Sequence, residues 1–263
     1  MEVIGYIASI FIGISLGLIG GGGSILTVPV LVYLFGITPE MSTAYSLFIV
    51  GITALVGAVR NASLGQIEYK TAVVFSIPAF IAVYLTRRFL VPSIPDPVFS
   101  TELMTLSKDT AIMVFFALIM LAASVSMIRT GKDEMEVAQK PVFNYPAIIT
   151  EGVLVGVLTG IVGAGGGFLI IPALVLFAKL PMKKAVGTSL LIIAFKSLIG
   201  FKGDIDRPDL IIDWTLLLTI SAIAIGGIFV GIYLTRFIDN TKLKKGFGWF
   251  VLAMAVYIML KQI

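Results

Sequence analysis

The chain has 263 residues, of which 58% are hydrophobic and only 13% are charged. A soluble domain of this size needs more polar surface than that. The absence of Cys and His removes disulfides, thiolate chemistry and the usual metal ligands, so we expect no cofactor, no metal and no enzyme. The net charge of +4 comes from basic residues between apolar segments, which is typical of membrane loops and does not indicate nucleic acid.

Apolar segments of membrane-spanning length follow one another along the chain, since a span needs about 20 such residues. They cover residues 3–35, 42–60, 71–90, 110–128, 146–178, 185–201, 212–235 and 246–262. The first and fifth are too long for one helix, and each has a glycine cluster near its middle. Because each Gly costs a helix about 1 kcal/mol relative to Ala, we expect two half-helices joined by an unwound turn in each.

An internal repeat relates the two halves of the chain at an offset of 143 residues. The offset matches the glycine clusters, and it also matches Ser46 to Ser189. Residues 84–87 match residues 233–236 at an offset of 149. We therefore expect a single membrane domain over 1–263, with repeat 1 over 1–130, a cytoplasmic linker over 131–145 and repeat 2 over 146–263.

The distribution of Lys and Arg distinguishes two topologies. If each glycine-broken segment is a hairpin that enters and leaves on one face, three crossings follow it, and the two halves are inverted. Only this arrangement gives one side of the membrane an excess of basic residues, as the positive-inside rule requires. The predicted fold is therefore all-α: a polytopic helical membrane protein with two homologous, inverted four-segment repeats, each starting with a Gly-broken hairpin.

Paired broken helices in inverted repeats are typical of secondary transporters. Backbone N–H groups at half-helix N-termini bind anions, so two such turns near the membrane midplane would form a small anion site. The alternative for the glycines is close helix packing. The candidate substrate-binding residues are those of the turns and the polar residues that follow them: Gly21, Gly22, Gly23, Ser24, Tyr45, Ser46, Gly165, Gly166, Gly167, Thr188, Ser189 and Lys196.

The side chains among these candidates have alternative roles. Lys196 lies in an apolar run, where a charged group is a functional candidate, but it could instead snorkel to the interface. The hydroxyl residues could cap helices or join them. Arg87 and Arg236 end matching spans, and we expect them to anchor at the membrane interface.

The glycine-rich segments 17–29 and 160–172, with the motif Ala-Val-Gly-Thr-Ser-Leu at 185–190, resemble those of the TauE/SafE family of sulfite and organosulfonate exporters. The resemblance extends over essentially the whole chain in length, spacing and duplication. It implies a multi-pass protein of the prokaryotic cell membrane that transports sulfite, sulfoacetate or related anions, generally outward.

The predicted function is therefore secondary transport of small anions, most of all the export of sulfite or a sulfonate through a site between the repeats. The alternatives are an uptake carrier or channel for another small organic anion, and a non-transporting membrane subunit. The expected partners are a small anionic substrate and the lipid bilayer, and homo-oligomerisation is left open.

Overall fold

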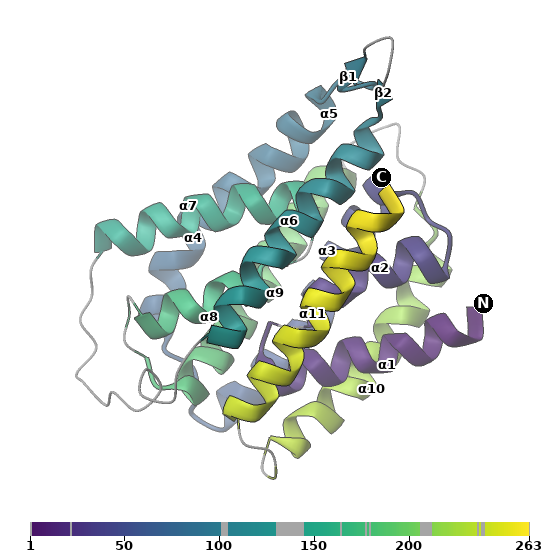
Figure 1. Ribbon diagram of the computed structural model, residues 1–263. Coiled ribbons are helices and arrows are strands. Elements are labelled where there is room, and N and C mark those ends of the chain that lie inside the picture. Colours follow the sequence, from purple (N-terminus) through teal and green to yellow (C-terminus); the bar gives the residue numbers. More distant parts are fainter. Residues whose placement is uncertain are drawn as a thin grey trace.

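The computed structural model describes residues 2–21, 23–100, 105–129, 145–163, 165–176, 178, 180–205, 212–235, 237 and 240–262. Gly22 and most of the expected linker (131–145) lie outside these residues. The first half contains α1 (Glu2–Ile19), α2 (Gly23–Leu34), α3 (Pro39–Ser63), α4 (Tyr69–Leu85), the π-helical turn η1 (Thr86–Leu90), α5 (Val91–Ser93), an antiparallel pair of short strands β1 (Phe99–Ser100) and β2 (Thr105–Leu106), and α6 (Lys108–Arg129). The second half contains α7 (Tyr145–Val162), α8 (Gly167–Leu176), α9 (Met182–Ile205), α10 (Trp214–Leu234) and α11 (Asn240–Gln262) (Figure 1).

These helices confirm the predicted apolar segments, including the two breaks. Gly20 follows α1 with φ of +75°, and its N–H donates to the carbonyl of Leu16 at 2.7 Å. Gly163 follows α7 with φ of +70°, and its N–H donates to the carbonyl of Thr159 at 2.8 Å. Because only glycine adopts such φ values without strain, both helices end in the same glycine cap.

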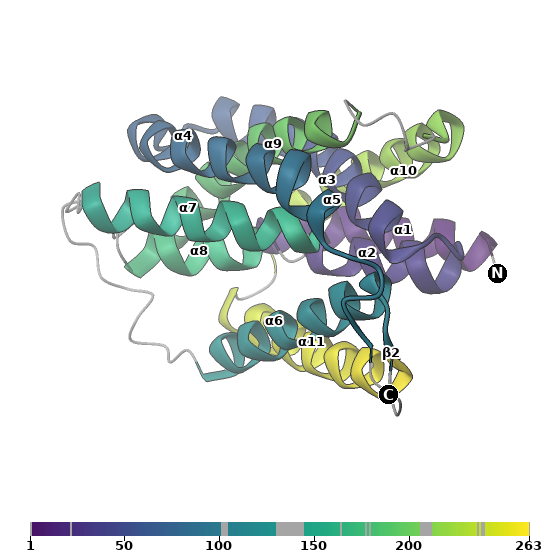
Figure 2. The same cartoon turned by 90° about the horizontal axis from the view of Figure 1, so that it is seen from above.

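The first broken segment is a helical hairpin. The ring of Phe35, just after α2, lies 5.3 Å from the ring of Tyr6 near the start of α1. Gly23, at the start of α2, packs against the carbonyl of Ile12 in α1. The chain therefore returns along α1 to the end from which it started. In Figures 1 and 2, α8 likewise runs back alongside α7.

Helices α3 and α9 form the buried centre of the bundle. Their apolar windows are 72% and 67% buried, more than those of the other long apolar helices. They run antiparallel, because Gly51 faces Leu198 and Gly200 faces Leu47. Small residues at these contacts let the two helices approach closely.

The first helix of each half packs against a helix of the other half: α1 against α10, and α7 against α4. A Cβ on Gly13 of α1 would lie 2.8 Å from the backbone nitrogen of Ile228 in α10. A Cβ on Gly156 of α7 would lie 2.7 Å from the carbonyl oxygen of Ala79 in α4. Gly13 and Gly156 are 143 residues apart, and Ala79 and Ile228 are 149 apart, so each contact is the repeat image of the other. Such reciprocity is what a two-fold relation produces.

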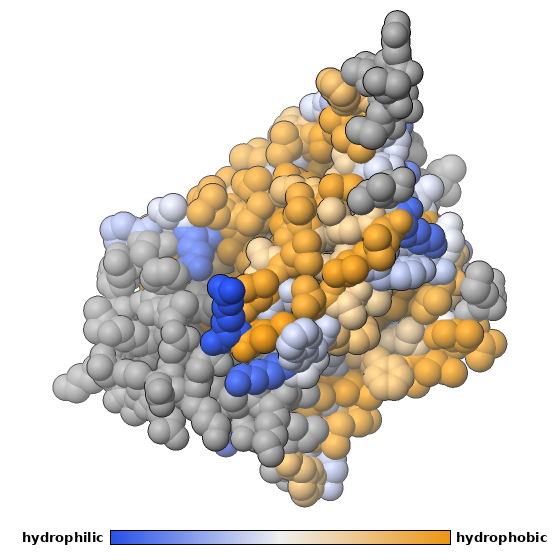
Figure 3. Space-filling view, in the orientation of Figure 1, coloured by the Kyte–Doolittle hydropathy of each residue, from blue (hydrophilic) through white to orange (hydrophobic). Residues whose placement is uncertain are grey.

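The outer surface is apolar over wide areas. Figure 2 shows α6 and α11 as a separate layer beside the other helices, and Figure 3 shows apolar residues over much of the coloured part of one face. Phe11, Leu118 and Phe229 are among the large apolar side chains that are at least half exposed. Within the described residues, five helices are long and apolar enough to cross a membrane. The fold is that of an all-α polytopic membrane protein.

The hairpins generate a prediction about topology. With a hairpin at the start of each half, three crossings follow it, and we expect both termini outside and residues 129–145 in the cytoplasm. Because the native chain contains no Cys, single cysteines at these positions can be labelled with a membrane-impermeant thiol reagent. In intact cells, cysteines at the termini should react and those in 129–145 should react only after permeabilisation. The reverse pattern would overturn the inverted topology.

Candidate functional site

The two glycine turns touch each other inside the bundle. A Cβ on Gly21 would lie 2.5 Å from the Cα of Gly167, and one on Gly167 would overlap the Cα of Gly21. Any side chain at either position would therefore meet the backbone of the other turn. The structure thus brings together parts of both predicted turns, and it does so by direct backbone contact between the two halves.

Lys196 is fully buried beside the second turn. Its ammonium group donates to the hydroxyl of Thr159 at 2.8 Å and to the carbonyl of Gly165. In the described part of the chain it forms no ion pair. The side chain points into the protein, so the snorkelling alternative does not describe this structure. Burial of a charged group without a counter-charge is costly, which marks this position as a functional candidate.

The serines of the predicted site are placed differently in the two halves. Ser24 donates to the carbonyl of Gly21 at 2.7 Å. The hydroxyl of Ser189 lies 3.1 Å from the carbonyl oxygen of Gly20 and 2.8 Å from that of Val186 in its own helix, and its one hydrogen is shared between them. Both hydroxyls therefore lie within hydrogen-bonding distance of backbone oxygens of the first turn. Ser46, the repeat mate of Ser189, is fully buried and has no hydrogen-bond partner among the described residues.

Other buried hydroxyls share that property, among them one on α3 and one on α9. Thr53 and Ser197 are fully buried and unpartnered within the described residues. Thr53 lies on the same face of α3 as Ser46 and is the repeat mate of Lys196, and Ser197 lies close to Gly165. An unmade hydrogen bond of this kind costs about 1–3 kcal/mol. The surroundings of the second turn thus retain unused donor capacity.

Tyr45 and Thr188 hold the starts of two other helices. The hydroxyl of Tyr45 accepts from the backbone N–H of Asp213, just before α10, at 2.6 Å. The hydroxyl of Thr188 accepts from the backbone N–H of Glu68, just before α4, at 2.9 Å. The alternative of joining helices, rather than capping them, describes these two residues, and their role in substrate binding stays a prediction.

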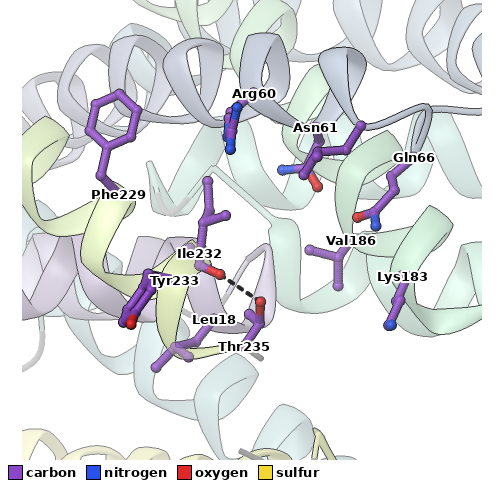
Figure 4. A pocket seen from close by; sticks show the side chains of 12 residues that line it. Leu18, Arg60, Asn61, Gln66, Lys183, Val186, Phe229, Ile232, Tyr233 and Thr235 are labelled. Atoms are coloured by element: carbon purple, nitrogen blue, oxygen red, sulfur yellow. Dashed lines mark hydrogen bonds between the residues drawn. The ribbon is translucent and has the colours of Figure 1, made fainter. Parts of the chain in front are cut away.

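A cavity of about 550 Å³ opens beside the first turn, and sequence reasoning did not identify it. Figure 4 shows that it lies between the C-terminal ends of α1, α3 and α10 and the start of α9. Val186 lines it and also packs against Gly20, so one residue separates the cavity from the first turn. Two cationic side chains line it, Arg60 and Lys183. Both lie at or next to an end of a predicted apolar segment, 42–60 or 185–201, and this position is the only signal in the sequence.

Arg87 is not an interface anchor, and that expectation is wrong. The guanidinium is fully buried and forms an ion pair with Asp204 at 2.7 Å. It also donates to the hydroxyl of Thr43 at 2.9 Å and to the carbonyl of Gly160 at 3.1 Å. The π-helical turn η1, which contains Arg87, interrupts α4 at this point, as such turns often do at functional sites.

Asp204 was missed by the sequence reasoning because it follows the predicted end of its span at residue 201. In the structure α9 continues to Ile205, so Asp204 lies in the last turn of a buried helix. The available signal was an acidic residue only three positions beyond the predicted end of the span. Its matched position, Asn61, ends α3 and lines the cavity.

The bundle, the two broken hairpins that meet inside it and the cavity beside the first of them define a class, the multi-pass membrane transporters. The family model described as "Sulfite exporter TauE/SafE" matches residues 6–258, and the chain belongs to that family. It is a transporter-family protein of the cell membrane.

Curated relatives cover most of the chain. A "Probable membrane transporter protein" of Xylella fastidiosa (strain 9a5c) is 30% identical over 253 residues, which are 94% of this chain and 91% of the relative. "Probable membrane transporter protein YunE" of Bacillus subtilis (strain 168) is 27% identical and covers 70% of both chains. A relative of Haemophilus influenzae with the same kind of name is 27% identical over 95% of this chain and 94% of its own. No solved structure matches the chain.

The backbone contact between the turns generates a prediction. Gly21→Leu and Gly165→Leu should each lower transport at least about tenfold. A Leu side chain at position 21 would overlap the backbone of the opposite turn, and a Leu at position 165 would have to adopt a φ of +62°. Gly226→Leu is the matched control, since a Cβ there meets nothing within 4 Å. Uptake by proteoliposomes at equal protein content measures the effect. Parental rates in all three variants would show that the turns are not part of the transport site.

Proposed function

We propose that this protein is a secondary transporter that exports small oxyanions, namely sulfite or a sulfonate such as sulfoacetate, through a site between the two repeats. The observation that supports this most directly is Lys196, a buried cation at the second glycine turn without an ion-pair partner in the described residues. The proposal follows from three features: the charge of this site, its hydrogen-bond donors and the access to it.

The charge of the site favours an anion. An ammonium group has three donors, and hydrogen bonds to Thr159 and Gly165 account for two of them. Neither partner carries a counter-charge. A bound anion would therefore offset the cost of keeping Lys196 charged away from water, and the cation would offset the loss of the anion's hydration.

The donors around the site suit an oxyanion. Ser46, Thr53 and Ser197 each offer a hydroxyl without a partner among the described residues. Helices α2 and α8 begin at the two turns, and helix N-termini carry partial positive charge. A sulfite or sulfonate group presents three oxygens as acceptors, which this combination of hydroxyls, ammonium and helix ends would satisfy.

Access to the turns comes through the cavity beside α1 and α3. Its volume of about 550 Å³ is within the usual range for small-molecule pockets. Arg60 and Lys183 make its wall positive, and a concave surface of one charge raises the local concentration of the opposite ion. Under the predicted topology this wall faces the cytoplasm, so it would collect anions for export.

The direction and the substrate rest on the family. The matching family model is described as a sulfite exporter, and its name supports sulfur-containing anions moved outward. Outward movement of one negative charge gains about 2.3 kcal/mol per 100 mV when the cell interior is negative. Export could therefore be driven by the membrane potential without a coupled ion. The alternatives that the sequence left open are uptake of another organic anion, a channel and a non-transporting subunit.

Reconstitution of the purified protein tests this function and the role of Lys196 together. We expect proteoliposomes to transport sulfite or sulfoacetate in preference to small carboxylates. Lys196→Met should lower the apparent affinity by about 1–2 kcal/mol, roughly tenfold, because it removes one charge-assisted hydrogen bond. Lys196→Arg should retain part of the activity, since the charge persists while the geometry changes.

The matched control is Lys202→Met, which removes an exposed cation from the same helix. It should transport like the parental protein. If Lys196→Met also does so at equal reconstitution levels, Lys196 is not a substrate ligand. If the proteoliposomes accumulate neither sulfite, sulfoacetate nor a small carboxylate, the anion-transport proposal itself is wrong.

A further inference from the structure

The cavity and the Arg87 cluster lie at opposite ends of the central helix pair. On α3, Asn61 lines the cavity, whereas Thr43 accepts from Arg87, and 18 residues of helix between them span about 27 Å. On the antiparallel α9, Val186 lines the cavity and Asp204 pairs with Arg87. The two glycine turns lie between these ends. A path that starts at the cavity and passes both turns therefore reaches Arg87.

The repeat relates these two ends residue by residue. Three residues that line the cavity have repeat mates at the offset of 143 residues. The mates of Gly17, Asn61 and Val186 are Gly160, Asp204 and Thr43, and these mates are the three partners to which Arg87 donates. Among the described residues, the space beside the first turn is thus a cavity, and the matching space beside the second turn holds the guanidinium of Arg87. Arg236, the repeat mate of Arg87, lies outside the described residues.

The packing of the glycine turns follows the same relation. Gly20 packs against Val186 at the cavity, and its mate Gly163 packs against Thr43 at the Arg87 end. Each turn therefore has one end of the α3–α9 pair as its neighbour. The repeat matches the two ends, and within the described residues they differ: a cavity lies at one end and Arg87 at the other.

The chemistry of Arg87 suits an exchange of partners. Its guanidinium is a planar donor group that binds carboxylate and sulfonate oxygens in the same way. In the closed arrangement Asp204 supplies the negative charge and the side chains are 0% and 1% exposed. A buried ion pair adds little net stability over apolar residues, and its best-attested use is to specify one of two states.

We infer that the Arg87 end is the second mouth of the transport pathway, closed in this structure by the Arg87–Asp204 ion pair, and that Arg87 binds the oxyanion when this mouth opens. The inference rests on the proposed function, because it assigns the exit for the anion that enters at the cavity. Closure of one end while the other is open is the condition for alternating access by the two repeats.

The absence of native cysteines allows a direct test with matched reporters. Thr235 lines the cavity, and its mate Thr86 is 3% exposed beside Arg87. Thr235→Cys and Thr86→Cys are labelled in oriented proteoliposomes with a membrane-impermeant thiol reagent, added on one side or the other. In the parental background, Thr235→Cys should react from the cavity side and Thr86→Cys should be protected.

Removal of the ion pair should open the second mouth. In the double variant Arg87→Met and Asp204→Leu, which leaves no buried charge unpaired, Thr86→Cys should react at least about tenfold faster from the side opposite the cavity. Labelling of Thr235→Cys should slow, because the two mouths alternate. The control variant, Glu40→Gln with Lys108→Gln, removes the partly exposed 3.0 Å ion pair between α3 and α6 and should change neither reporter.

A second measurement uses the intact ion pair. Sulfoacetate, which does not react with thiols, should accelerate labelling of Thr86→Cys if the protein transports it. If the double variant does not accumulate as a folded protein, Arg87→Lys takes its place in the experiment. This variant should raise the labelling rate of Thr86→Cys by a smaller factor than the double variant. Continued protection of Thr86→Cys in the double variant or in Arg87→Lys, with Thr235→Cys still reactive, would overturn the second mouth. Labelling of the Arg87 variants requires no transported anion, so a failure of this inference is distinguishable from a failure of the proposed function.

Discussion

Backbone contact between Gly21 and Gly167 places two unwound turns against each other inside an apolar bundle. Unwound backbone at membrane depth must have its polar groups satisfied by the protein or by a polar cavity. Here Ser189, Ser24 and Lys196 donate to the turn carbonyls of Gly20, Gly21 and Gly165. The side chains expected to bind substrate thus also hold the turns in place. The fold and the candidate site depend on the same few contacts.

The contact of the turns determines which helices can lie together. Since α1 must end at one turn and α7 at the other, each hairpin extends outward and packs on a helix of the opposite half, α10 or α4. The long helices α3 and α9 fill the space between the hairpins. Neither half can therefore be described as an independent unit, even though the repeat boundary is clear in the sequence.

Differences between the repeats make the two halves chemically asymmetric. Lys196 corresponds to Thr53, so the positive charge at the turns comes from one half only. Asp204 corresponds to Asn61, so one end of the central pair carries an acid that can bind Arg87, and the other end carries an amide that lines an open cavity. Similar backbones thereby present different chemistry at the two ends and at the centre.

The sequence by itself determined the spans, the two breaks, the repeat and the family resemblance, because hydrophobicity and glycine content act locally and are visible in order along the chain. It also named Lys196 and the serines beside the turns as candidates, and their role in binding stays a prediction. It did not identify the Arg87–Asp204 pair, the cavity or the hydrogen bonds by which Tyr45 and Thr188 join helices of the two halves. Those features were decided by the tertiary structure, because each joins a residue of one half to a residue of the other, and only the packing of α4, α9 and α3 brings them within hydrogen-bonding distance.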